Sequence, residues 1–159
     1  MEQSITIELN GERRVLSVRT DAPLLEMLRD GCGLSSVRET CGIGICGACT
    51  VLVDGVPINS CLLLAPLADG CRITTVEGLS RGGELHPVQR AFIERMAFQC
   101  SYCTPGMILS AVALLAEHPD PSPDEIAEYL AGNLCRCGSY PNILAAIADA
   151  ARSLRQGKA

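Results

Sequence analysis

The chain has 159 residues, of which 48% are apolar and 3% aromatic, and its net charge is −5 at pH 7. This length allows one domain or two small ones, and a modest acidic charge without a basic patch argues against nucleic-acid binding. No basic and apolar leader is visible at the N-terminus, and no apolar run is long enough to span a bilayer, so we expect a cytoplasmic protein without a membrane span.

The first half of the chain is predicted to form a small mixed sheet with one helix. Ile5, Ile7 and Leu9 alternate with polar residues, as in a half-buried strand. The dipeptide at 10–11 is Asn-Gly, which favours a hairpin turn. A short helix is expected at 24–28, after Pro23, and further strands are expected at 15–18, 50–53, 56–58 and 73–76.

The second half has helical periodicity. Thr104 is expected to cap a helix with Pro105 in its first turn, and the capping-box pattern at 122–125 predicts another helix. Four helices are expected, at 88–96, 104–115, 122–130 and from 141 onward. A linker-like stretch at 78–83 divides the chain into domains at 1–79 and 84–159.

Eight of the ten cysteines fall into two groups of four with different spacings. The first group has the spacing C-x4-C-x2-C-x11-C, and the second has C-x2-C, a long gap and C-x-C. The groups are Cys41, Cys46, Cys49 and Cys61, and Cys100, Cys103, Cys135 and Cys137. Four thiolates around one point form a metal site, and the first spacing is that of a plant-type 2Fe–2S cluster. Glycines between these ligands permit the positive φ angles that a cluster-wrapping loop needs.

Two other interpretations of the cysteines compete with iron–sulfur clusters. Disulfides require an oxidising compartment, which the absence of a leader argues against. Structural zinc also takes four cysteines, and the spacing of the second group alone leaves zinc and iron–sulfur equal. Cys32 and Cys71 belong to neither group, and we expect both to act as small, partly buried apolar residues.

No residue has the pattern of a catalytic acid, base or nucleophile. His86 and His118 each precede a proline, so we expect loop or helix-end positions for them. Arg38, Glu39 and Arg136 are expected to be solvated or capping charges near the cysteines, where they could tune the charge of a cluster.

The cysteine motifs with their flanking residues resemble a known family. The segments 41–51, 99–107 and 132–137 are similar to those of the small iron–sulfur subunit of the molybdenum hydroxylases. That family includes xanthine dehydrogenase, aldehyde oxidoreductase and aerobic carbon monoxide dehydrogenase. The resemblance implies an α+β fold with an N-terminal ferredoxin-like β-grasp domain followed by an all-α four-helix bundle. It also implies that each domain holds one 2Fe–2S cluster.

The same resemblance implies cofactors and partners outside this chain. These are a large subunit with molybdopterin, in its cytosine dinucleotide form, and a medium FAD subunit, in a heterotrimer or a dimer of heterotrimers. Electrons would pass from molybdopterin to the second cysteine group, then to the first group and on to flavin. The chain would be a non-catalytic electron-transfer subunit. Gln99 and Cys137 would lie near the pterin.

Three departures from the family pattern affect the surroundings of the ligands but not the ligands themselves. Ser101 stands where many relatives have glycine, Gly138-Ser139 replaces a common Thr-Gly, and the segment 34–38 is unusual. Reduction potentials should therefore differ from those of relatives. The substrate would bind in another subunit, and a nitrogen heterocycle is favoured on family breadth alone. The alternatives are a free ferredoxin-like carrier and a zinc-stapled interaction module.

Overall fold

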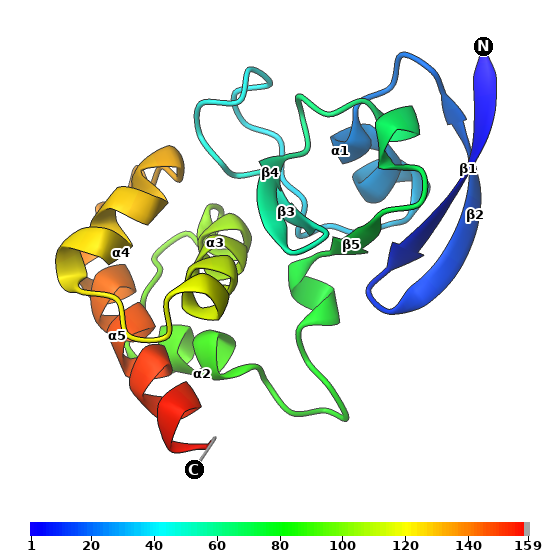
Figure 1. Cartoon of the computed structure of the whole chain (residues 1–159). Coiled ribbons are helices and arrows are strands. Elements are labelled where there is room, and N and C mark those ends of the chain that lie inside the picture. Colours follow the sequence, from blue (N-terminus) through cyan, green and yellow to red (C-terminus); the bar gives the residue numbers. More distant parts are fainter. Residues whose placement is uncertain (158–159) are drawn as a thin grey trace.

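A computed structural model describes residues 1–157, which fold as a β-sheet half and a helical half joined by one connection (Figure 1). The sheet order is β2-β1-β5-β3-β4. β1 and β5 pair in parallel and the other neighbours pair antiparallel, which confirms the predicted mixed sheet. The strands are β1 (Glu2–Leu9), β2 (Glu12–Arg19), β3 (Thr50–Val53), β4 (Val56–Asn59) and β5 (Arg72–Thr74).

The helix predicted in the first half begins as α1 (Leu24–Glu26) and continues as a π-helical turn, Met27–Gly31. Pro23 lies just outside it, in an extended conformation. Leu24 and Leu28 are fully buried against the inner side chains of the sheet, Ile5 and Ile7 among them. Burial of this apolar face is what stabilises so short a helix.

The last strand of the sheet is shorter than predicted. β5 ends at Thr74, because the side-chain oxygen of Asn10 accepts the backbone N–H of Thr75 at 2.8 Å. The amide nitrogen of Asn10 in turn donates to the Thr75 hydroxyl at 3.0 Å. Val76 therefore belongs to a 3₁₀ turn, Val76–Gly78, that leads out of the sheet.

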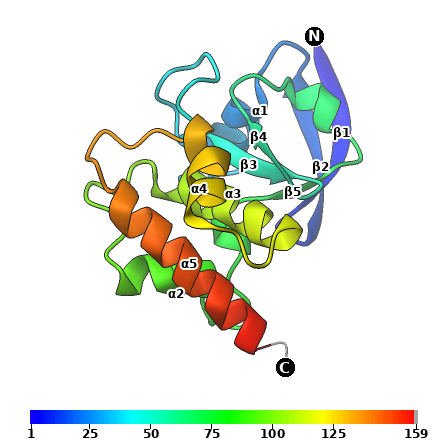
Figure 2. The ribbon, with the colours of Figure 1, turned by 60° about the vertical axis from the view of Figure 1, so that its left-hand side comes forward.

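Four α-helices make up most of the second half, as expected. They are α2 (Pro87–Glu94), α3 (Thr104–Glu117), α4 (Pro123–Tyr129) and α5 (Tyr140–Gln156). α2 and α4 each pack against both α3 and α5 (Figure 2). Phe92, Met107, Ile126 and Ile143 are almost completely buried between them. Among residues 1–157, no helix is both long and apolar enough to cross a membrane.

The N-termini of α2, α3 and α4 can be compared with the predicted helix caps. The capping box at α4 is confirmed: the Glu125 N–H donates to the Ser122 hydroxyl at 3.3 Å, and the Ser122 N–H to the Glu125 carboxylate at 2.7 Å. His86 lies at a helix end, as expected, and its Nδ1 accepts the Val88 N–H. The Thr104 cap is wrong. Cys103 already has helical dihedrals, so Thr104 is the first helical residue and its hydroxyl is buried without a partner.

The two halves share an apolar contact. α3 packs directly on β3 and β4, and Leu52 of β3 meets Leu109 and Ala113 of α3 in a small buried cluster. In Figure 2, α3 lies between the sheet and α5. The halves are therefore held against each other by packing as well as by the connecting chain.

Candidate metal centres

The first cysteine group lies on the long loop between the π-helical turn and β3, with Cys61 just after β4. The three glycines that lie between the cysteines of this loop, Gly42, Gly44 and Gly47, have positive φ. Gly44 illustrates why: a Cβ there would lie 2.3 Å from the Leu62 side chain, and φ is +75°. The positive φ predicted for the glycines of this loop is confirmed at this position.

The thiols of this group lie in two neighbouring pairs. The backbone N–H groups of Ile43 and Cys46, with the Cys46 side chain, lower the pKa of the Cys41 thiol to about 6. Burial, with the adjacent Cys49 side chain, raises the pKa of the Cys61 thiol to about 11. Cys41 therefore neighbours Cys46, and Cys49 neighbours Cys61.

The second group gathers at helix ends, as expected. Cys100 and Cys103 precede α3, and Cys135 and Cys137 precede α5. The sulfurs of Cys100 and Cys137 lie 3.5 Å apart. The Tyr102 N–H, followed by the Cys137 side chain, lowers the pKa of the Cys100 thiol.

Cys103 and Cys135 form the other pair of the second group. Burial, with the neighbouring Cys135 side chain, raises the pKa of the Cys103 thiol to about 12. In the second group, each pair therefore joins the segment before α3 to the segment before α5.

These pairs fit a cluster of two iron atoms. A 2Fe–2S cluster takes four thiolates, two on each iron. Backbone N–H groups point at thiols in both groups, as cluster sulfurs require. A cavity of about 400 Å³ is bordered by one cysteine of the first group, Cys46, and three of the second, Cys100, Cys103 and Cys135.

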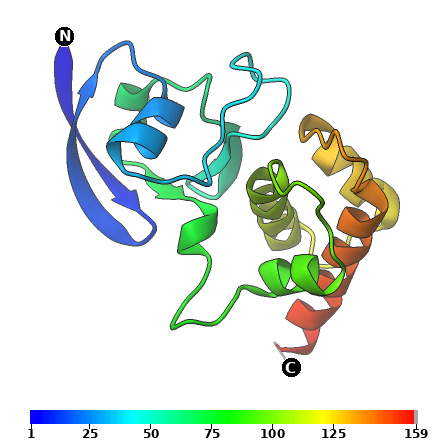
Figure 3. The same cartoon turned by 180° about the vertical axis from the view of Figure 1, so that it is seen from behind.

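The two groups lie next to each other, although they come from different halves. In Figures 1 and 3 the loop that carries the first group approaches the segment that precedes α5. The Leu134 N–H donates to the Cys46 carbonyl at 2.9 Å. One hydrogen bond therefore joins a residue of the first group to the neighbour of Cys135.

Asn133 holds this junction together. Its buried side chain donates to the Gly47 carbonyl at 3.1 Å and to the Thr50 hydroxyl at 3.2 Å, and accepts from the Ser110 hydroxyl at 2.8 Å. Gly106 faces the same carbonyl, since a Cβ there would lie 2.3 Å from the Gly47 oxygen. These residues have no ligand spacing, so their role was not visible in the sequence.

A second contact between the cysteine loops was also missed. Arg38 was expected to be solvated or to cap a helix, but its guanidinium donates to the Ser101 carbonyl and stacks on Tyr102, 5.1 Å from the ring centroid. The Tyr102 hydroxyl donates to the Glu39 carbonyl at 2.7 Å. Arg136, in contrast, is exposed, as expected.

Gln99 lies beside the second group. Its side-chain amide donates to the Cys137 carbonyl at 3.1 Å, and both residues are accessible from outside the chain. The remaining cysteines lie apart from both groups. Cys32 packs against the core of the sheet half and burial raises the pKa of its thiol, whereas Cys71 is half-buried beside Asp54.

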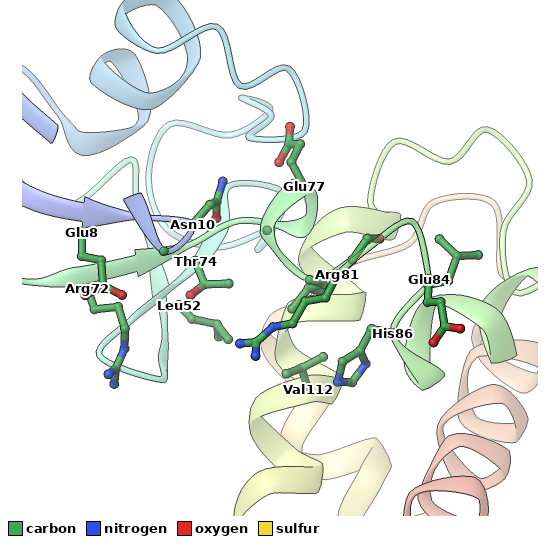
Figure 4. A pocket seen from close by; sticks show the side chains of 15 residues that line it. Glu8, Asn10, Leu52, Arg72, Thr74, Glu77, Arg81, Glu84, His86 and Val112 are labelled. Carbon is green, nitrogen blue, oxygen red and sulfur yellow. The ribbon is translucent and has the colours of Figure 1, made fainter. Parts of the chain in front are cut away.

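A larger hollow, of about 770 Å³, lies elsewhere, between the β-sheet half and the connection to α2 (Figure 4). Its lining is charged, with Arg72 and Arg81 near Glu8 and Glu84, and it contains no cysteine. This hollow is therefore separate from both cysteine groups.

Comparison with known families divides the chain between two models. Residues 7–75 match the "2Fe-2S iron-sulfur cluster binding domain", and residues 75–148 match the "[2Fe-2S] binding domain". The chain is therefore a protein with two 2Fe–2S-binding domains.

Individual relatives define its family. The chain is 47% identical to the small FeS subunit of nicotinate dehydrogenase from Eubacterium barkeri, over 91% of this chain and 92% of that one. It is 45% identical to the iron–sulfur-binding subunit PaoA of aldehyde oxidoreductase from Escherichia coli, over 95% of this chain and 72% of that one. A crystal structure of quinoline 2-oxidoreductase from Pseudomonas putida 86 superposes with a TM-score of 0.94 at 44% identity, over 99% of both chains. The chain belongs to the small iron–sulfur subunits of the molybdenum hydroxylases, and its function is electron transfer within an oxidoreductase.

Proposed function

We propose that the two cysteine groups are the ligand sets of two 2Fe–2S clusters. Cys41, Cys46, Cys49 and Cys61 would hold one, and Cys100, Cys103, Cys135 and Cys137 the other. Such clusters supply one-electron redox chemistry. The observation that supports this assignment best is the pairing of the thiols within each group, with backbone N–H groups directed at Cys41 and Cys100.

We further propose that this chain conducts electrons between two partner subunits and has no catalytic residue of its own. The second cysteine group would face a large molybdopterin subunit, and the first would face a medium FAD subunit. Exposed apolar side chains surround the cysteines, among them Ile43 and Ile45 on the first loop and Leu134 beside the second group. Apolar patches of this kind mark protein interfaces.

Gln99 and Cys137 are the residues proposed to lie at the pterin, taken as molybdopterin cytosine dinucleotide. The hydrogen bond from Gln99 to the Cys137 carbonyl supports a shared role, because it fixes the side-chain amide of Gln99 beside Cys137. We also propose two domains, a β-grasp domain at 1–79 and a four-helix bundle at 84–159. The proposed assembly is a heterotrimer or a dimer of heterotrimers.

The substrate class proposed for the complex is a nitrogen heterocycle. Two of the similar proteins carry the names of such substrates, nicotinate and quinoline. Aldehydes are the competing class, since another relative is a subunit of an aldehyde oxidoreductase. Turnover of the purified complex with nicotinate, quinoline and benzaldehyde separates the two, and oxidation of benzaldehyde alone would refute the heterocycle assignment.

Cluster binding is tested on the purified full chain by iron and sulfide analysis and by electron paramagnetic resonance (EPR) after reduction. We expect about four iron atoms per chain, since two clusters hold two irons each, a red-brown colour and two distinct signals. Cys135→Ser should remove one signal, whereas the matched variant Cys32→Ser should keep both. A colourless chain that contains zinc would refute the proposal.

A further inference from the structure

Arg38 connects the two cysteine loops through a single cation. It lies three positions before Cys41, the first ligand of the first group, and its guanidinium reaches the loop between Cys100 and Cys103. There it donates to the Ser101 carbonyl and stacks on the Tyr102 ring. Arg38 is half-buried, so this charge is partly screened from water.

The acceptor of this hydrogen bond belongs to a peptide unit that also contacts a ligand. The carbonyl of Ser101 and the N–H of Tyr102 are the two ends of one peptide group. That N–H is directed at the Cys100 thiol, where it lowers the pKa of the thiol. The Arg38 guanidinium, the peptide group and the Cys100 sulfur therefore lie in series. In such a series each donor polarises the next group.

The backbone at Ser101 gives the peptide this orientation. Ser101 has a φ of +62°, in the left-handed region that costs a residue with a side chain about 1–2 kcal/mol. A strained residue is retained only where the surroundings determine its conformation. Here the surroundings are the Arg38 donor on one side of the peptide and the Cys100 sulfur on the other.

We propose that Arg38 is a positioning residue that raises the reduction potential of the cluster held by Cys100, Cys103, Cys135 and Cys137. Reduction adds one negative charge to a cluster, and a nearby cation stabilises that charge. Hydrogen bonds to ligand sulfurs raise the potential as well. This inference rests on the proposed ligand assignment, because it needs a cluster at the second group.

The test is a redox titration of both clusters in the purified full chain, followed by EPR. Arg38→Gln removes the charge and should shift the second cluster to a lower potential, by more than the first cluster. Arg38→Lys keeps the charge but loses the planar contact with the ring and the carbonyl, so its shift should have the same direction and be smaller. Arg13→Gln, which removes an exposed charge on the distant hairpin, should leave both potentials unchanged.

A further variant separates the effect of the Arg38 charge from that of the position of the loop. Tyr102→Phe loses the bond to the Glu39 carbonyl but keeps the ring under Arg38, so its second cluster should keep the wild-type potential. A shift in Tyr102→Phe as large as that in Arg38→Gln would overturn the inference, and so would an unshifted Arg38→Gln with both clusters present. If Arg38→Gln fails to assemble the second cluster, Arg38→Met takes its place as the uncharged variant, and a wild-type potential there refutes the proposal.

The iron content of the chain shows whether a negative result concerns the role of Arg38 or the proposed ligand assignment. A wild-type chain without two clusters would refute the ligand assignment. A wild-type chain with two clusters and an Arg38→Gln variant of unchanged potential would refute only the role of Arg38.

Discussion

Gly106→Ala should destabilise the protein even though it adds only one methyl group. The new Cβ would lie 2.3 Å from the Gly47 carbonyl oxygen, whereas ordinary contact begins at 3.4 Å, so the first cysteine loop must move by about 1 Å. Overpacking of this kind costs about 1–3 kcal/mol. The same movement weakens the bond from Asn133 to that carbonyl, which contributes about 1 kcal/mol.

A helical preference acts in the opposite direction. Gly106 lies within α3, where alanine is favoured over glycine by about 1 kcal/mol. The net loss is therefore about 2 kcal/mol, with the packing term decisive. For a chain of this size each kcal/mol lowers the melting temperature by about 2–4 °C, so we expect a fall of about 4–8 °C.

The assay is thermal unfolding of the cluster-loaded chain, followed by circular dichroism and by the visible absorbance of the clusters. Gly132→Ala is the matched control, because no heavy atom lies within 4 Å of its added Cβ and its φ is not positive. That control should change stability by about 0.5 kcal/mol or less. An unchanged melting temperature in Gly106→Ala would refute the claim that this close approach holds the two loops together.

Three further predictions use other features of the structure. Burial, with the nearby Arg81 charge, lowers the pKa of His86, so the folded state favours the neutral imidazole. The free energy of unfolding should therefore be highest above about pH 6.5 and should fall as the pH drops through the lowered pKa. In urea titrations at several pH values, a His86→Asn variant should lose this dependence. Ser101→Gly relieves a positive φ and should raise the free energy of unfolding by about 0.5–1 kcal/mol, net of glycine's greater freedom in the unfolded chain; a lower urea midpoint would contradict this. Complete removal of iron should lower the melting temperature and speed proteolysis of both halves, since each is near the size at which a core alone is marginal; an unchanged melting temperature would argue against it.

The sequence predicted best those features that depend on neighbours along the chain. The strands, the capping box at Ser122 and the wrapping glycines follow from local patterns, and so does the gathering of Cys103 and Cys135 at helix ends. Thr104 was misassigned because its local pattern is that of a cap, whereas Cys103 occupies the cap position with helical dihedrals and Thr104 is already the first residue of α3.

The features that were missed depend on contacts between distant segments. Asn133 binds the carbonyl of a residue 86 positions away, and Arg38 binds one 63 positions away. Neither side chain has a periodicity or spacing that marks it, because its partner is a backbone carbonyl rather than another recognisable side chain. Such contacts become visible only when the two halves are placed against each other.

The apolar contact between the halves has a kinetic consequence. Leu52 packs against Leu109 and Ala113, and the Leu134 N–H donates to the Cys46 carbonyl, so the two halves are in contact at two places. We therefore expect the two cysteine groups to keep a constant separation, without a swinging of one half toward the other before electron exchange. Under the proposed ligand assignment, the rate of that exchange should not depend on solvent viscosity, in contrast to carriers whose redox domains must diffuse into contact.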